Sequence, residues 1–169
     1  EGFTPDKKEL HSVSNPLDLW ILSELNSLVA SVDASYAEYE PTRAARAIQE
    51  FTVENLSNWF VRLSRRRFWK SEQGSDQLMA FSTLHHCLET VALLMAPIAP
   101  FFADRLFGDL QVGRSSDAPS SVHCADFPEL DEKRIDQELQ WRMRKAQKIT
   151  SMILGIRKKE RIRVRQPLR

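Results

Sequence analysis

The 169-residue chain has little of what most catalytic sites are built from. Its five glycines, at positions 2, 74, 108, 113 and 155, match neither of the common glycine-rich phosphate loops. No GxSxG nucleophile elbow occurs. The two cysteines, Cys87 in a helical pattern and Cys124 in a loop pattern, make no disulfide framework. The chain itself is therefore expected to make or break no covalent bond.

Metal-ligand spacing is also lacking. His85, His86, Cys87, His123 and Cys124 are the obvious ligand types, but HExxH and paired CxxC motifs are absent. We expect His85 or His86 to cap a helix or line the core, and we expect no metal site.

Long apolar runs are scarce. The longest, around residues 91–102, is interrupted by Pro97 and Pro100 and is too short to span a membrane. No charged-then-apolar leader is present, so secretion is unsupported and the cytoplasm is the default. With 42% hydrophobic and 28% charged residues, the composition is that of one soluble globular domain.

What is present is segregated charge. The net charge is only +1, yet residues 61–70 hold five basic residues and no acid. Residues 141–169 hold eleven basic residues and only Glu160 as an acid, so the two segments together contain 16 of the 24 cations. A polyanion that contacts both segments would account for this distribution.

The chain is organised around residues 41–69. Their apolar positions step by three or four residues, which predicts one buried face of a helix that starts at Pro41. The preceding segment from Asn15-Pro16 to Glu40 has the same periodicity, so the two are expected to form an antiparallel hairpin. The positions expected on the buried face of the second helix are Ala45, Ile48, Thr52, Leu56, Trp59 and Leu63.

Three more helical patterns follow, over residues 75–95, 101–110 and about 131–156. We therefore predict an all-α bundle of about five helices, with the faces of Leu17, Ile48, Leu84 and Ile149 converging on one core. Residues 161–165 alternate at a period of two, with every second residue cationic. They predict a short extended segment, the first strand of a further domain.

Within the organising helix, Arg62, Arg65 and Arg66 share a second face at positions i, i+3 and i+4. A phosphate-binding surface is one interpretation. A solvated face, or cations that complement the helix dipole, is another. Trp59 and Trp69 fit the core better than a base-stacking platform, and spacing alone does not decide between these interpretations.

Several longer stretches carry a resemblance. NPLDLWILSELNSLV, LSNWFVRLSRRRFW, APIAPF, SVHCADFP and RVRQPL, in that order along the chain, look like the isoleucyl-tRNA synthetase family of class Ia. The similar part is its helical anticodon-binding domain. The resemblance implies a lead-in from a catalytic domain over residues 1–14, the helical domain over 15–160, and a truncated C-terminal domain that begins at 161–169.

The resemblance implies that the full-length enzyme attaches isoleucine to tRNA(Ile) using ATP and Mg²⁺, with zinc possible only outside this region. The HIGH-type and KMSKS-type motifs, the editing domain and the remaining C-terminal region are not in this sequence. The implied role of this part is to hold the anticodon stem and loop, as a monomer and without a cofactor of its own. The residues expected to bind tRNA are Arg62, Arg65, Arg66, Arg67, Trp69, Lys70, Arg161, Arg163 and Arg165.

Two other functions compete with this one. A helical protein-interaction module could use the same basic ends to bind an acidic protein partner. A metal-dependent helical enzyme would need stoichiometric metal, and we rank it last.

Overall fold

The computed structural model describes residues 13–69, 74–111 and 119–167, and within them all regular structure is helical. This confirms the all-α prediction. The chain divides into two compact units, residues 1–135 and 136–169, which are described separately. The first unit contains α1 (Pro16–Ala37), α2 (Pro41–Glu50), the π-helix η2 (Phe51–Val61), α3 (Arg65–Phe68), α4 (Ser75–Met95), α5 (Pro100–Leu110) and two 3-10 turns, η3 (Val122–Cys124) and η4 (Glu132–Arg134). The second unit contains α6 (Gln137–Lys159).

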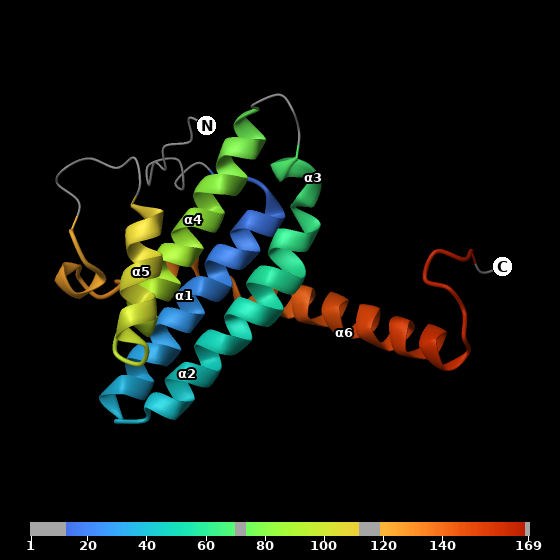
Figure 1. The fold of residues 1–169 in the computed structure, drawn as a ribbon. Coiled ribbons are helices and arrows are strands. Elements are labelled where there is room, and N and C mark those ends of the chain that lie inside the picture. Colours follow the sequence, from blue (N-terminus) through green and yellow to red (C-terminus); the bar gives the residue numbers. More distant parts are fainter. Residues whose placement is uncertain (1–12, 70–73, 112–118, 168–169) are drawn as a thin grey trace. The chain divides into compact units, whose positions relative to one another are not determined.

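The predicted antiparallel hairpin is present (Figure 1). The Asn15 side chain accepts a hydrogen bond from the Leu17 N–H (3.0 Å) and Pro16 occupies the first turn, so α1 begins where the sequence indicated. Tyr39, with a φ of 58°, turns the chain between α1 and α2. The Glu40 N–H then donates to the Ser35 carbonyl. This tight turn sends α2 back along α1.

The core of the first unit lies between α1, the α2–η2 rod and α4. Each of these helices contributes one buried apolar face, and a satellite cluster of Ala92, Ala103, Phe107 and Val122 joins α4, α5 and η3. Leu17 and Leu84, expected at the centre, are only half-buried. The most deeply buried side chains include Trp20, Ile21, Leu25, Val32, Phe60, Cys87 and Leu94.

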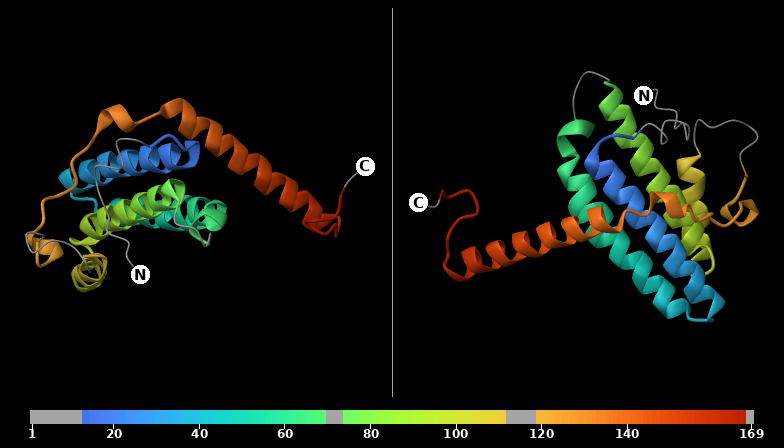
Figure 2. Two further views of the ribbon diagram at one scale, coloured as in Figure 1. Left: turned by 90° about the horizontal axis from the view of Figure 1, so that it is seen from above. Right: turned by 180° about the vertical axis from the view of Figure 1, so that it is seen from behind.

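The organising helix departs from α-helical geometry in its middle. α2, η2 and α3 run on in one direction as a rod (Figure 2). Along it the buried positions are Ala44, Ile48, Phe51, Leu56, Phe60 and Ser64, with one step of five residues between Phe51 and Leu56. That longer step is the signature of a π segment, which adds a residue without moving the buried face.

Because of the π segment, part of the buried face predicted for the second helix is wrong. An unbroken α-helix would bury Trp59 and Leu63, but Trp59 is half-buried and Leu63 is 54% exposed. Phe60 and Ser64 are buried in their place, each one position later in the sequence. The π geometry of η2 shifts every residue after it by one helical position.

By length and composition, α4 could cross a membrane. However, 50% of its most apolar stretch is buried inside the structure, and the core helix of a soluble protein can have the same length and composition. This is weak evidence for a membrane span.

The last helix differs from its prediction in two ways. Asp131 accepts a hydrogen bond from the Lys133 N–H and caps η4, whereas Asp136 accepts one from the Leu139 N–H and caps α6. The helix therefore begins at Gln137 and not near residue 131. Ile149 is 56% exposed, so its predicted place in the core is wrong. In the described part of the second unit, residues 136–167, α6 is the one helix, so it has no neighbouring helix within that unit on which to bury a face.

Candidate functional site

Three exposed arginines lie at one end of the α2–η2–α3 rod, around α3 (Figure 1). Arg62 follows the π segment, and a turn at Ser64 separates it from Arg65 and Arg66. Within the described residues, none of the three has a carboxylate within ion-pair distance. Guanidinium groups on an exposed surface are suited to forked contacts with phosphates. We call Arg62, Arg65, Arg66 and Trp69 the arginine surface.

Trp69 belongs to this surface and not to the core. Its side chain is 80% exposed, which overturns the expectation from spacing. The Arg65 guanidinium carbon lies 6.0 Å from the centroid of the Trp69 ring, within range of a cation–π interaction. An exposed indole beside arginines is a platform on which an unpaired base can stack.

Arg67 is turned into the bundle, unlike its neighbours. Its Nη1 and Nη2 donate to the two carboxylate oxygens of Asp18 at 2.8 and 2.6 Å, and Nη2 lies 2.8 Å from Asp76. Its side chain is 11% exposed and that of Asp18 is fully buried. The hydrogen bond to Asp18 raises the pKa of the Arg67 guanidinium. With both carboxylates as partners, Arg67 is less available to a phosphate than the three exposed arginines.

The basic C-terminal segment, residues 161–167, folds back on the end of α6. It contains no strand. Arg161 has a φ of 56°, and Arg157 Nη1 donates to the carbonyls of Arg163 (2.8 Å) and Gln166 (2.9 Å). Arg161, Arg163 and Arg165 remain exposed beside the last turn of α6. Lys70, the remaining predicted contact, lies outside the described residues, and the domain boundary at 161 stays a prediction.

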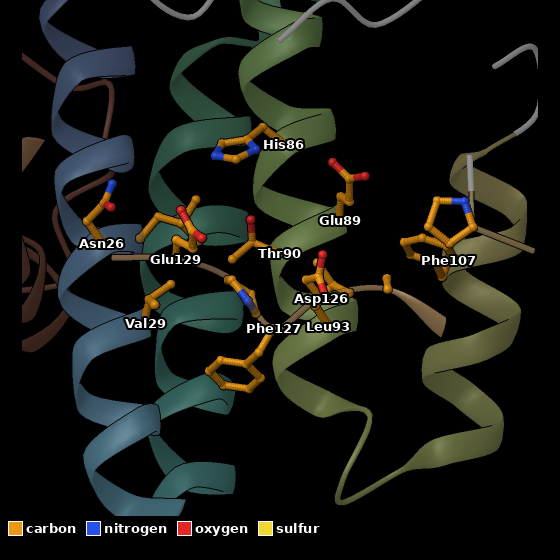
Figure 3. Close-up of a pocket in the computed structure, with 14 residues that line it drawn as sticks. Asn26, Val29, His86, Glu89, Thr90, Leu93, Phe107, Asp126, Phe127 and Glu129 are labelled. Carbon is orange, nitrogen blue, oxygen red and sulfur yellow. The ribbon is translucent and has the colours of Figure 1, made fainter. Parts of the chain in front are cut away.

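The first unit also has a pocket of about 390 Å³ between α1, α4, α5 and the 119–129 segment (Figure 3). His86, Glu89 and Thr90 line it from α4, and Asp126 and Glu129 line it from the segment. The Glu89 side chain also accepts a hydrogen bond from Gln111 (3.3 Å). Three carboxylates give the pocket a negative potential that is unsuited to phosphate.

His85 and Cys87 have structural positions. His85 Nε2 forms a hydrogen bond with the Leu110 carbonyl (2.9 Å) at the end of α5, as the capping prediction requires. Cys87 is fully buried, and burial together with the charge of Asp18 raises the pKa of its thiol. Such a thiol is a poor nucleophile. Among the described residues, no three His, Cys, Asp or Glu side chains are grouped as metal ligands.

Comparison with known families decides between the remaining interpretations. The model of the family described as the anticodon-binding domain of tRNA ligase matches residues 18–169. The chain belongs to this family. The resemblance inferred from the sequence motifs is thereby confirmed, and the alternative of a module for acidic protein partners has no support.

Curated relatives of this anticodon-binding domain are similar over nearly its whole length. The isoleucine–tRNA ligase of Bacteroides thetaiotaomicron is 52% identical over 99% of this chain. That of Cytophaga hutchinsonii is 56% identical over 89% of the chain, and that of Dehalococcoides mccartyi is 46% identical over 99%. The chain spans only 14–16% of the length of these relatives.

The partner of Arg67, Asp18, was not identified from the sequence. Asp18 holds Arg67 from a position 49 residues earlier. A carboxylate in the first turn of a helix is explained by its interaction with the helix dipole alone. The sequence therefore gave no indication that Asp18 has a side-chain partner.

Proposed function

We propose that the first unit holds the anticodon stem and loop of tRNA(Ile) as part of an isoleucine–tRNA ligase. The observation that carries this proposal is the arginine surface, where three exposed arginines accompany one exposed tryptophan. RNA stems are bound through phosphates and 2′-hydroxyls, and unpaired loop bases stack on aromatic side chains. The surface offers both kinds of contact within one short stretch of chain.

Arg67 takes part in this proposal as a positioning residue. Its ion pair with Asp18 fastens α3 to the first turn of α1, and its contact with Asp76 fastens it to the first turn of α4. Fixed in this way, the exposed side chains of α3 need less ordering when RNA binds.

The experiment is a fluorescence-anisotropy titration of labelled tRNA(Ile) with the 169-residue chain and its R62Q/R65Q/R66Q variant. We expect the variant to bind about 10- to 100-fold more weakly at 0.1 M salt. With fewer phosphates neutralised by arginine, fewer counterions are released from the tRNA on binding. The dependence of log affinity on log salt should also become shallower, by about one unit for each arginine that binds a phosphate in the wild type.

The matched control is R43Q/R46Q/R105Q, which removes the same charge from exposed positions of α2 and α5. It should bind tRNA(Ile) within about twofold of the wild type. Equal decreases in affinity for the two variants would mean that overall charge, and not the arginine surface, governs binding.

The activity of the whole ligase is a separate part of the proposal. The full-length protein would join isoleucine to tRNA(Ile) in the cytoplasm, as a monomer, with ATP and Mg²⁺ bound by a catalytic domain outside these residues. The relatives' names and the 46–56% identities to them support this assignment.

A further inference from the structure

The pocket beside α4 has the size and the lining of a small-molecule site. Its volume of about 390 Å³ lies within the range of ligand pockets, about 300–1,000 Å³, and exceeds by far the roughly 30 Å³ that one water occupies. Val29, Leu93 and Phe107 line it from α1, α4 and α5, and Phe127 lines it from the 119–129 segment (Figure 3). The pocket therefore has room and apolar surface for the hydrocarbon part of an organic molecule.

A buried hydroxyl group faces this pocket. Thr90 is 5% exposed, and its oxygen points into the pocket from α4 (Figure 3). Within the described residues its side chain forms no hydrogen bond, whereas Thr52 and Thr150 each donate to the carbonyl four residues earlier in their helices. A buried polar group without a partner costs free energy. The Thr90 hydroxyl is thus placed to meet a polar group of a ligand.

Two exposed acids that line the pocket lack a counter-charge. The side chains of Asp126 and Glu129 form no ion pair and no hydrogen bond with any described residue. The third carboxylate, that of Glu89, lies deeper and is 4% exposed. Residues 1–135 as a whole contain 13 Lys and Arg against 20 Asp and Glu, so the field of this unit also favours a cationic ligand.

The three carboxylates are spread along the pocket. The Asp131 N–H donates to the Asn26 side chain (3.1 Å), which holds the chain next to Glu129 against α1. Figure 3 shows Glu89 nearer to α5, with Thr90 between these two acids. Among the described residues, no three His, Cys, Asp or Glu side chains form a group that could hold a metal ion. Charges placed in this way suit separate ammonium groups on one flexible chain better than a single metal ion.

From the volume, the buried hydroxyl and the separated acids, we propose that this pocket binds a linear aliphatic polyamine. One ammonium group donates to Glu89 and Thr90, and another lies between Asp126 and Glu129. The methylene groups between them pack on the apolar wall, which removes their surface from water. This inference goes beyond the proposed function, because the arginine surface has no part in it.

The test is a calorimetric titration of the 169-residue chain with spermidine, without RNA because polyamines also bind nucleic acid. The first variant, D126N/E129Q, changes two exposed side chains and so preserves the fold. The second, T90V, removes the buried hydroxyl without changing charge. The matched control, D33N/E50Q, removes two negative charges from exposed positions of α1 and α2 that do not line the pocket. Circular dichroism confirms that each protein retains its helices.

We expect the wild type to bind one spermidine molecule saturably. Its affinity should fall about 3- to 30-fold in D126N/E129Q, because two exposed ion pairs are lost. It should fall about 3- to 10-fold in T90V, because one hydrogen bond is lost. The control should stay within about twofold of the wild type, since distant exposed charges are screened by salt.

Two further probes test the chemistry of the ligand. A monoamine of the same chain length should bind about 3- to 30-fold more weakly than spermidine, because it leaves one acidic group of the pocket without a counter-charge. A neutral diol of the same length should show no saturable binding.

Four results would overturn the inference. They are a wild type that does not bind spermidine saturably, a D126N/E129Q variant that binds it like the wild type, an equal loss of affinity in D33N/E50Q, and a monoamine or diol that binds as tightly as spermidine. The titration with tRNA(Ile) is a separate measurement. A chain that binds spermidine in this way but does not bind tRNA(Ile) would contradict the proposed function and leave the polyamine site standing.

Discussion

At the scale of the residue, neighbouring arginines have opposite surroundings. Arg65 and Arg66 are exposed, and Arg67 is directed to the fully buried carboxylate of Asp18. A buried carboxylate is tolerated only with a well-placed partner, and the bidentate guanidinium supplies both hydrogen bonds. Together with its contact to Asp76, Arg67 joins α3 to both α1 and α4.

Replacing Arg67 by methionine should lower the free energy of unfolding by about 3–5 kcal/mol, because it leaves Asp18 buried without a counter-charge. The D18N/R67M variant should recover much of this stability, since no buried charge then remains. Urea denaturation followed by circular dichroism measures both. At temperatures where R67M is folded, its salt slope for tRNA(Ile) should equal that of the wild type; a shallower slope would show that Arg67 contacts phosphate directly.

At the scale of the element, the π segment η2 decides which side chains of the rod are exposed. It adds one residue between Phe51 and Leu56, so that Phe60 and Ser64 face the core and Leu63 faces outward. The position of every arginine after it depends on this added residue. The π segment therefore sets the composition of the arginine surface.

Deleting Glu54, an exposed residue of η2, should convert the π segment into an ordinary α-helix. Leu56, Phe60 and Ser64 would then keep their buried places at α-helical spacing. We expect a cooperative thermal transition within a few degrees of the wild type.

Deleting Ser27 from the middle of α1 is the matched control. That helix has no π segment to absorb the deletion, so Leu28, Val29 and Val32 would rotate by about 100° out of the core. We expect no cooperative transition from this variant. If the Glu54 deletion unfolds the chain as well, the extra residue is required for packing and the interpretation of η2 is wrong.

At the scale of the whole molecule, charge and structure divide at the same place. The first unit has the core and an excess of acids, and the second has α6, the one helix among its described residues, and an excess of bases. Like charges repel, so the excess of cations in residues 136–169 lowers the stability of that unit. Their concentration is better explained by a polyanionic partner.

The chain by itself should form no aminoacyl-adenylate. Its glycines match neither of the common glycine-rich phosphate loops, and the sequence contains no HIGH-type or KMSKS-type motif. Isoleucine-dependent exchange of labelled pyrophosphate into ATP should equal that of a no-protein control. Exchange above that level would mean that the chain contains a nucleotide site that its sequence does not reveal.

The sequence by itself determined the helices, the hairpin and the family. Proline, asparagine and turn residues mark the ends of α1, α2 and α5, and local hydrogen bonds at those ends depend on nearby residues only. Motifs such as LSNWFVRLSRRRFW are long enough to identify a family. Only the tertiary structure decided that Arg67 pairs with Asp18, that Trp69 is exposed and that Ile149 is not in the core. These outcomes depend on which surfaces meet across 49 residues or more and on one added residue in η2, and helical periodicity contains no information about either.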